Sequence, residues 1–210
     1  MDTKHDTKLQ ILDAAELLFA ENGYHATSIR HITQQAEVNL AAIHYHFGSK
    51  ENLLEAVLAR RIQPVNELRL EQLRSLPEPQ WTVRHLVESF LEPPFHAVVG
   101  MQDRSRQFVR MIGRVHSELS PQFHQVFKEL MQETIMIFVQ AFQKVLPNLP
   151  LPQIMMRLHF TIGTMAHAMH LISGQLPFAP EVPNPEMLIL AIVDYCTAGF
   201  TYDLPNQTRG

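Results

Sequence analysis

Residues 27–50, TSIRHITQQAEVNLAAIHYHFGSK, have a spacing that predicts two short helices joined by a tight turn. The hydroxyl of Thr27 or Ser28 is placed to accept a backbone N–H at the start of the first helix. One face of that helix carries apolar residues at helical spacing, namely Ile29, Ile32 and Ala36. Glu37 and Val38 then form the turn. The neighbouring segments are expected to pack around this stretch.

The second helix of this stretch has two different faces. Asn39 caps its start and Gly48 ends it, and Ile43 and Phe47, four residues apart, point into a core. The opposite face is small, polar and aromatic, and consists of Leu40, Ala41, His44 and Tyr45. Lys50 lies at the N-terminus of the helix that follows. Two helices around a turn, the second with a hydrogen-bonding outer face, are typical of a DNA-binding helix-turn-helix.

The segments LQILDAAELLFAENGYHATSIRHI and AEVNLAAIHYHFGSKENLLEAV, within residues 9–57, resemble the N-terminal domain of TetR-type transcriptional repressors. Two positions depart from the family pattern: Glu37 stands where the family usually has Gly, and Ala41 and Ala42 stand where it has Gly-Thr. Glu adopts a positive φ less readily than Asn or Asp, so either the turn differs slightly or Glu37 stays right-handed. The version NLAAIHYHFGSKE is similar to a subgroup that includes fatty-acid-responsive regulators.

Composition limits the class of protein. The chain has 210 residues, of which 46% are hydrophobic, and a net charge of −4. Up to Ile62 there are six Lys and Arg against eight Asp and Glu, so the helix-turn-helix pattern, not charge, argues for DNA. Few ionic phosphate contacts imply weak non-specific binding and a modest dependence on salt. The polar N-terminus, the lack of a long apolar run and the single Cys196, expected to be buried, favour a cytoplasmic protein without disulfides.

The remaining chain is predicted to be helical throughout. A helix over residues 8–22 ends at Gly23, and a longer one over 49–76, with a kink at Pro64, is the expected link between two domains. Prolines separate the further predicted helices, which cover residues 81–91, 104–118, 121–146, 152–173 and 185–200. The fold class is therefore all-α, with a three-helix DNA-binding domain at residues 1–62. A larger helical domain follows at 63–205 and a tail at 206–210.

Candidate DNA contacts cluster in the helix-turn-helix. Asn39, His44 and Tyr45 carry groups that read base edges or phosphates, and Leu40 and Ala41 suit a thymine methyl group. The family resemblance implies contacts by Tyr45, Thr27 and Lys50, whereas Arg30 is either a phosphate contact or a solvated charge, and His46 either packs inward or reaches DNA. The predicted DNA-binding residues are Thr27, Ser28, Arg30, Asn39, Leu40, Ala41, His44, Tyr45 and Lys50.

The middle helices are rich in Met and Phe, which form either plain core or an adaptable apolar pocket. The family resemblance favours a pocket for an inducer, predicted to be lined by Phe108, Met111, Arg114, Phe127, Met131, Met156 and Phe160. Three arginines lie in apolar helices, Arg110, Arg114 and Arg157, and one of them is expected to pair with a ligand carboxylate or phosphate. The alternative partners are Glu118, Glu129 and Glu133. The expected effector is apolar or amphipathic, such as a fatty acid or acyl-CoA.

Several histidines of the helix over residues 152–173 raise the question of a metal site. His159, His167 and His170 share a helix without a carboxylate or cysteine on the same face, so no metal and no cofactor are predicted. That helix, with residues 185–200, is the dimer interface that the resemblance implies for a homodimeric repressor on a pseudo-palindromic operator. The alternatives are a helix-turn-helix dimer without an inducer and an enzyme. The sequence has no phosphate-binding loop and no nucleophile or metalloprotease motif to support an enzyme.

Overall fold

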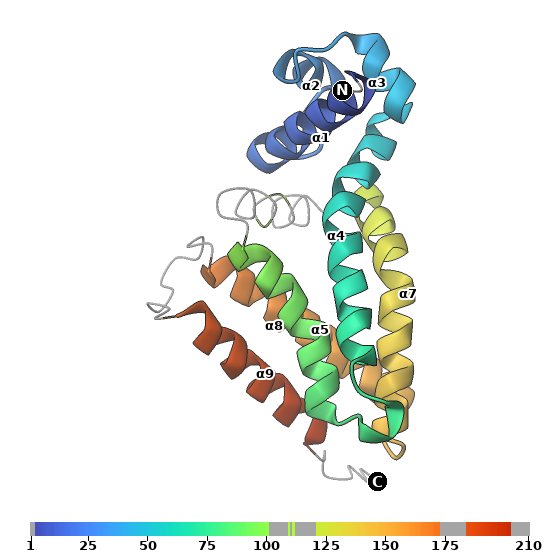
Figure 1. Ribbon diagram of the computed structural model, residues 1–210, viewed down its shortest axis with the longest axis vertical. Coiled ribbons are helices and arrows are strands. Elements are labelled where there is room, and N and C mark those ends of the chain that lie inside the picture. The colour runs from blue at the N-terminus through green and yellow to red at the C-terminus, as the bar shows by residue number, and fades with distance from the viewer. Residues whose placement is uncertain (1–2, 101–108, 110, 112–120, 173–183, 203–210) are drawn as a thin grey trace, which may run out of the picture. The chain divides into compact units, whose positions relative to one another are not determined.

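The computed structural model describes residues 3–100, 109, 111, 121–172 and 184–202. Every regular element in these ranges is helical, which confirms the predicted all-α class (Figure 1). The helix predicted for residues 104–118 lies outside this description except at Val109 and Met111. The chain divides into two compact units, unit 1 with Met1–Asn66 and Ala97–Glu133, and unit 2 with Glu67–His96 and Thr134–Gly210.

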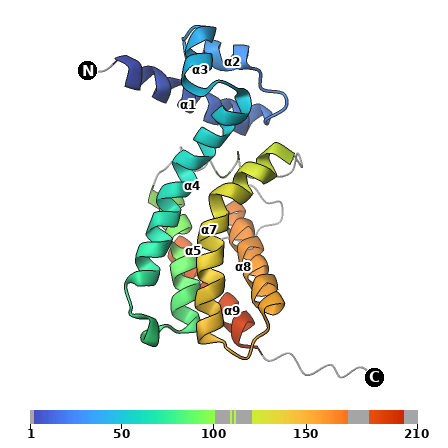
Figure 2. The ribbon, with the colours of Figure 1, turned by 90° about the vertical axis from the view of Figure 1, so that its right-hand side faces the viewer.

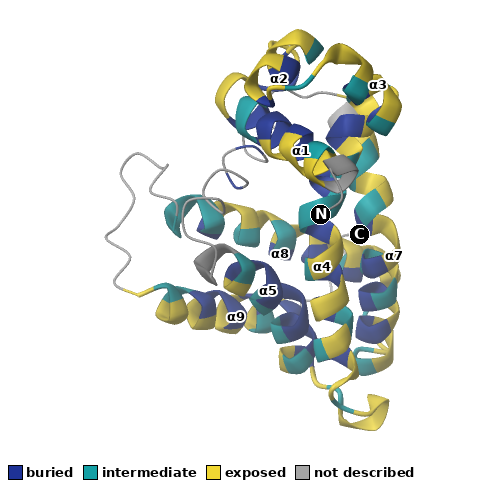
Figure 3. Cartoon of the chain, turned by 45° about the horizontal axis from the view of Figure 1, so that its top comes forward, coloured by how far each residue is buried: buried dark blue, intermediate teal, exposed yellow. Residues whose placement is uncertain are grey.

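Unit 1 begins with three helices that pack on one another, α1 (Thr3–Asn22), α2 (Ile29–Gln35) and α3 (Leu40–Phe47). Figure 3 shows buried and exposed residues on each of these helices. The core is built from apolar side chains of α1, α2, α3 and the next helix, and includes Ile11, Phe19, Ile32, Ile43, Leu53, Leu54, Val57 and Leu58. The 3.6-residue periodicity of the sequence therefore gave the correct inner faces.

Helix α4 (Lys50–Arg74) continues without interruption through Pro64. Its residues up to Asn66 belong to unit 1 and those from Glu67 onward to unit 2. Proline has no N–H, so the helical hydrogen bond to the carbonyl of Arg60 is absent. The predicted helix over 49–76 is thus one residue longer at its start and two at its end than the observed one.

Unit 2 contains the second half of α4, a short 3₁₀ helix (Glu78–Gln80) and four further helices or parts of them (Figure 2). These helices are α5 (Val83–Gly100), α7 (Pro121–Val145), α8 (Leu151–Ile172) and α9 (Pro185–Thr201). Aromatic side chains fill the centre: the rings of Phe142 and Phe200 stack with centroids 4.0 Å apart, and Phe90 meets Phe138 edge-on at 5.1 Å. Such pairs add to the stabilisation by apolar burial.

The prediction that Pro93 and Pro94 break the fifth helix is wrong, because α5 runs through both to Gly100. A proline inside a helix leaves the carbonyl four residues earlier without its helical donor. For Pro94 that carbonyl belongs to Phe90, and the buried Arg69 donates its Nε–H to it at 2.9 Å. The Arg69 guanidinium also lies 4.4 Å from the Phe90 ring centroid. Burial lowers the pKa of Arg69 to about 9. The hydrogen bond from the Arg69 side chain replaces the backbone hydrogen bond that Pro94 cannot donate.

Candidate DNA-binding surface

The helix-turn-helix is closed by two side-chain caps. The Ser28 hydroxyl accepts the N–H of His31 at 3.2 Å at the start of α2, and the Asn39 side chain accepts the N–H of Ala42 at 2.9 Å at the start of α3. Each cap satisfies one of the backbone donors that a helix start leaves open. The prediction of Asn39 as a cap is confirmed, and of the two alternatives for the first helix the structure selects Ser28.

The turn between α2 and α3 holds Glu37 in the left-handed region. Its φ is +54°, and among the described residues no other non-glycine has a positive φ. Of the two alternatives for this turn, the right-handed one is therefore excluded. Glu37 adopts a conformation that glycine accepts without steric penalty, which explains why the family pattern has glycine at this position.

Helix α3 separates a buried face from an exposed one, as its sequence predicts. Ile43 and Phe47 are buried, and Tyr45 is 68% exposed. The other exposed residues of this face are Asn39, Leu40, Ala41 and His44. The Nδ1–H of His44 donates to the carbonyl of Gly48 at 3.1 Å, which orients the imidazole on the surface. The exposed face therefore combines an amide, an imidazole and a phenol with two small apolar patches.

Thr27 does not lie on this surface. Its side chain is only 1% exposed, and its hydroxyl donates to the carbonyls of Gly23 at 2.7 Å and Leu18 at 3.0 Å. The predicted DNA contact by the Thr27 side chain is therefore corrected: this hydroxyl fastens the loop before α2 to the end of α1. The sequence placed two hydroxyls side by side, and only three-dimensional packing decides which one is buried.

Lys50 is half-buried and bonds to the loop between α1 and α2. Its ammonium donates to the carbonyl of Tyr24 at 2.5 Å and lies 4.2 Å from the centroid of the Tyr24 ring. The Tyr24 hydroxyl donates to Glu51 at 3.1 Å. Burial, and then the Glu51 carboxylate, raise the pKa of Tyr24 to about 12, and bonds to backbone, Ser49 and Tyr24 lower the pKa of Glu51. Sequence reasoning placed Lys50 at a helix start and missed this role in positioning the loop.

The other predicted DNA-binding side chains, Ser28 and Arg30, are exposed. His46 is half-buried, and its ring meets those of Tyr45 and Phe47 with centroids 5.1 Å and 6.1 Å away. Ser28, Arg30 and the outer face of α3 are therefore accessible to DNA, whereas Thr27 is buried and Lys50 is partly buried.

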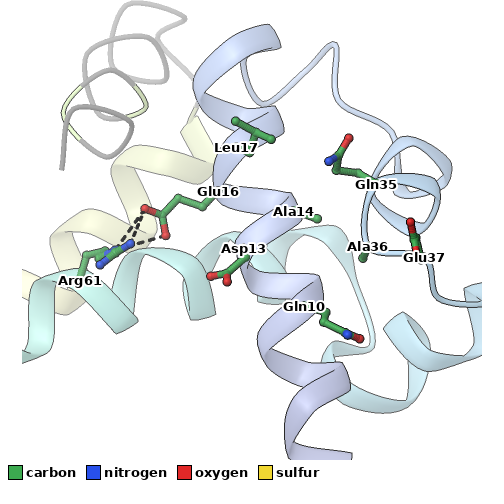
Figure 4. Close-up of a pocket in the computed structure, with 9 residues that line it drawn as sticks. All are labelled: Gln10, Asp13, Ala14, Glu16, Leu17, Gln35, Ala36, Glu37 and Arg61. Carbon is green, nitrogen blue, oxygen red and sulfur yellow. Dashed lines mark hydrogen bonds and ion pairs between the residues drawn. The ribbon is translucent and has the colours of Figure 1, made fainter. Parts of the chain in front are cut away.

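A buried carboxylate fixes α1 to α4 behind this surface. Glu16 is 3% exposed and accepts hydrogen bonds from Arg61, with Arg61 Nη2 at 2.8 Å (Figure 4). Arg60 also donates to Glu16, and it pairs with Asp13 at 2.7 Å. Glu16 and Arg61 line one side of an open hollow of about 420 Å³. Its other lining residues are Gln10, Asp13, Ala14, Leu17, Gln35, Ala36 and Glu37. The signal in the sequence was a glutamate on the apolar face of α1 and two arginines in α4.

The residues predicted to hold an effector are not all inside the protein. Met111 and Met131 are buried and Phe127 is half-buried, whereas Phe108 and Arg114 lie outside the described residues. Met156 and Phe160 are 42% and 61% exposed on α8, so their prediction as pocket residues is wrong. Both side chains lie on the outer face of their helix because Ile154, Leu158 and Thr161 occupy the inner one.

Arg157 is hydrogen-bonded to backbone groups of the protein itself. Its guanidinium donates to the carbonyl of Phe200 at 2.5 Å and to that of Tyr202 at 2.9 Å, at the C-terminal end of α9. A cation is favourable at this end because the last carbonyls of a helix lack helical donors and carry partial negative charge. Arg157 therefore fastens α9 to α8, and none of its predicted carboxylate partners is needed.

Helices α8 and α9 pack on each other and also expose apolar stripes. The exposed large apolar side chains are Leu151, Met155, Met156 and Phe160 on α8, and Met187, Leu190 and Tyr195 on α9. Gly163 and Gly199 follow these side chains on their helices, and a Cβ placed on either would meet no atom within 4 Å. On α8 the pairs Leu151 and Met155, and Met156 and Phe160, are each four residues apart and so lie on neighbouring turns of one face.

The described residues contain no group of three or more His, Cys, Asp and Glu that could hold a metal ion. His159 and His167 are exposed, and His170 donates its Nδ1–H to the carbonyl of Ala166 at 2.7 Å. Cys196 is buried, and burial raises its pKa. None of the described helices has the length and apolar character needed to cross a bilayer.

Two family profiles match the chain. The family described as "Tetracyclin repressor-like, C-terminal domain" matches residues 88–199, more than half of the chain, and "Bacterial regulatory proteins, tetR family" matches residues 11–57.

Individual relatives are similar mainly in the N-terminal part. The chain is 32% identical over 85 residues to the HTH-type transcriptional regulator UidR of Escherichia coli strain K12, which covers 40% of the chain and 41% of UidR. It is 32% identical over 83 residues to the HTH-type transcriptional activator FasR of Mycolicibacterium smegmatis, which covers 40% of the chain and 38% of FasR. The chain thus spans about half or less of the length of the curated relatives it matches.

The fold is similar to that of solved regulators. A crystal structure of a transcriptional regulator of the TerR/AcrR family from Aquifex aeolicus VF5 superposes with a TM-score of 0.58 at 21% identity. The superposition covers 90% of this chain and 96% of that one. At this identity the likeness concerns the arrangement of helices alone.

Proposed function

Because the chain belongs to the TetR family of bacterial regulatory proteins, we propose that it is a transcriptional repressor that binds a pseudo-palindromic operator as a homodimer and is released by a small molecule. The observation that carries the DNA-binding part is the exposed face of α3. Asn39, His44 and Tyr45 present hydrogen-bonding groups there, opposite the buried Ile43 and Phe47. A short capped helix of this kind fits the major groove with its outer face toward the base edges.

Ionic contacts play a small part in this binding. Helix α3 contains no Lys, Arg, Asp or Glu, and Arg30 is the only arginine of α2. Phosphate contacts then come from Arg30, from the Ser28 hydroxyl and from backbone N–H groups. Lys50 contributes its charge from a position on Tyr24, so that a phosphate contact requires it to leave or share that partner. The operator affinity is expected to fall less steeply with salt than that of strongly basic regulators.

The homodimer is proposed to form through α8 and α9. Met155, Met156 and Phe160 on α8 and Leu190 and Tyr195 on α9 are large apolar side chains left exposed in one chain. Groups of exposed apolar side chains often mark protein–protein interaction sites. Two copies related by a two-fold axis would bury the same stripes in one four-helix bundle, since a two-fold interface is self-complementary.

The effector is proposed to be apolar or amphipathic, such as a fatty acid or an acyl-CoA. The buried Met111 and Met131 and the half-buried Phe127 support an adaptable apolar site. Arg157 is not a candidate for an acidic head group, because two carbonyls occupy its guanidinium. The effector weakens operator binding only to the extent that it prefers the conformation that does not fit DNA.

Repression, as opposed to activation, is a consequence of where the operator lies relative to a promoter, and the similar protein FasR is a transcriptional activator. A genomic binding-site selection with the purified protein, followed by transcription from the selected promoters in vitro, tests both parts of the proposal. A recovered inverted repeat and lower transcription on addition of protein are the expected results. Recovery of random DNA would refute the DNA-binding function, and higher transcription would refute repression.

A matched pair of variants links the selected DNA to α3. Leu40 on α3 is 46% exposed and Leu68 on α4 is 48% exposed, so Leu40→Ala and Leu68→Ala remove equivalent side chains. Only Leu40→Ala is expected to weaken binding to the recovered operator. Equal affinities of the two variants would show that α3 is not the reading helix. Titration of the operator complex with fatty acids and acyl-CoA then tests the effector, and an operator complex that no such compound dissociates would reject this chemical class.

A further inference from the structure

The imidazole of His44 is held in one tautomer on the surface of α3. Its Nδ1 lies 3.1 Å from the carbonyl oxygen of Gly48, the residue that ends the helix. A carbonyl oxygen only accepts hydrogen bonds, so Nδ1 carries the hydrogen. The second ring nitrogen, Nε2, is then a pure acceptor in the neutral imidazole. His44 is exposed, and Nε2 is its second polar atom.

This acceptor has few possible partners on DNA. Phosphate oxygens, guanine O6 and N7 and thymine O4 only accept, and cannot bond to a neutral Nε2. The amino groups of adenine, N6, and of cytosine, N4, are the donors that the major groove offers. A neutral His44 is therefore complementary to an amino base and is opposed by a keto base in the same place.

The neighbouring side chain has the opposite polarity. The Asn39 oxygen accepts the N–H of Ala42 at 2.9 Å, so the Asn39 group offered outward is the amide NH₂, a donor. Helix α3 thus presents a donor at its first turn and an acceptor at its last. No Lys, Arg, Asp or Glu on α3 overrides this polarity with a full charge.

We infer that His44 is a specificity-determining residue that selects adenine or cytosine, and rejects guanine or thymine, at one position of each operator half-site. The inference rests on the proposed DNA-binding function and assigns the chemistry of one contact within it. Protonation of the imidazole converts Nε2 from an acceptor into a donor while Nδ1–H stays on Gly48. The same position then prefers a keto base, guanine or thymine, when His44 is protonated.

Other groups near α3 titrate as well. Helices α1 and α2 pack against α3. Charged or titratable side chains lie on these three helices, on the loops between them and at the start of α4. They are Asp6, Lys8, Asp13, Glu16, Glu21, Tyr24, His25, Arg30, His31, Glu37, Tyr45, His46, Lys50 and Glu51. Histidines change charge between about pH 5 and 8, so a change in total affinity with pH does not isolate His44. A change of base preference at a single position does, because it depends on which atom meets the base.

The test is a binding-site selection at pH 8 and at pH 5.5 with the full chain and three variants. At pH 8 the wild type is expected to prefer adenine or cytosine by about tenfold at one position of each half-site, the effect of one hydrogen bond gained and one mismatch avoided. At pH 5.5 that position is expected to shift toward guanine or thymine. His44→Ala should flatten the position at both pH values and leave the rest of the operator unchanged.

His44→Lys is the matched control, because lysine is a donor at both pH values. It should select guanine or thymine at the same position without a shift between pH 8 and pH 5.5. His46→Gln removes the neighbouring imidazole and should keep the wild-type shift. The inference is overturned if the wild type selects an operator in which no position depends on His44, or if His44→Lys shows the same shift as the wild type. Selection of no operator at all would instead overturn the proposed DNA-binding function.

Discussion

The outer face of α3 and the outer faces of α8 and α9 are both exposed, but their chemistry is opposite. On α3 the exposed side chains are Asn39, His44 and Tyr45 beside small apolar ones, and Asn39 and His44 each have a defined hydrogen bond to the backbone. On α8 and α9 the large apolar exposed side chains are Met, Leu, Phe and Tyr, beside a few polar ones such as His159 and Asp194. The first kind of surface suits base edges, which require directed hydrogen bonds, and the second suits a copy of itself, which requires apolar area.

The largest expected effect tests the apolar side of this comparison. Phe160→Glu places a charge on the α8 stripe, where Phe160 is its most exposed member at 61% in one chain. Each dimer would bury two such charges, so the dimer dissociation constant should rise at least about 100-fold, or roughly 3 kcal/mol. Sedimentation equilibrium measures this constant.

Met136 on α7 provides the control, since it is 46% exposed and not part of either stripe. Met136→Glu should leave the dimer intact. If Met136→Glu dissociates the dimer and Phe160→Glu does not, the interface lies on α7 and the comparison between α3 and α8 loses its apolar partner.

A second experiment compares the two surfaces by replacing one equally exposed tyrosine on each. Tyr45 on α3 is 68% exposed and Tyr195 on α9 is 71% exposed. Tyr45→Ala should weaken operator binding by roughly 1–3 kcal/mol and leave the dimer unchanged, because Tyr45 lies on the proposed DNA-binding face and not on the proposed dimer interface. Tyr195→Ala should weaken the dimer and affect operator binding only at protein concentrations near the dimer dissociation constant.

Fluorescence anisotropy with the selected operator and sedimentation of the free proteins separate these two outcomes. A Tyr195→Ala variant that loses DNA binding while remaining dimeric would place a DNA contact on α9. A Tyr45→Ala variant that keeps full affinity would remove Tyr45 from the proposed reading surface.

The two surfaces also differ in how far the sequence predicts them. On α3 the pattern is local: caps, a turn and a 3.6-residue period determine which side faces the core, and Ile43 and Phe47 are buried as predicted. On α8 an apolar side chain is compatible with the protein interior, with a ligand pocket and with a second copy. The sequence therefore predicts Met156 and Phe160 as pocket residues, whereas in the structure both lie on the outer face of α8.

Contacts between residues far apart in the chain could not be predicted from the sequence either, because several partners are chemically equivalent until the helices pack. Arg157 finds its partners at the end of α9, and Glu16 finds Arg60 and Arg61 across 44 and 45 positions of the chain. Thr27 and Ser28 are chemically alike, and the choice between them depends on the carbonyls of Gly23 and Leu18. The fold class and the helix positions follow from periodicity, whereas the supporting contacts of the site require the packed structure.

A third prediction concerns the loop that supports α3. Tyr24→Phe removes the hydroxyl that donates to Glu51 at 3.1 Å, and should lower the free energy of unfolding by about 1 kcal/mol at neutral pH. The pKa of Tyr24 is raised to about 12 in the folded protein, so the folded state favours the neutral phenol. Its contribution to stability is present below about pH 10, the ordinary pKa of tyrosine, and is lost as the pH rises toward about 12.

Urea unfolding at pH 7 and at steps between pH 9.5 and 11.5 checks this sign. The wild type should lose stability over the alkaline range faster than Tyr24→Phe, so that the two curves converge. Tyr195→Phe, on the exposed stripe of α9, should follow the wild-type curve. Parallel curves for the wild type and Tyr24→Phe would show that the Tyr24 hydroxyl does not fasten the loop through Glu51.

The smallest effect is expected at Glu37, the residue with a positive φ in the turn before α3. A left-handed conformation costs an L-residue about 1–2 kcal/mol, whereas glycine avoids this penalty but loses about 0.5–1 kcal/mol more chain entropy on folding. With φ at +54°, Glu37→Gly should therefore raise the free energy of unfolding by about 0.5 kcal/mol. Glu37→Gln removes the charge and keeps the strained backbone, so it should leave stability unchanged in the same urea titration. A gain in Glu37→Gln equal to that in Glu37→Gly would assign the effect to charge and not to φ. Both variants should bind the operator more tightly if the carboxylate next to α3 repels phosphate, and this gain should shrink as salt is added, because screening weakens the repulsion.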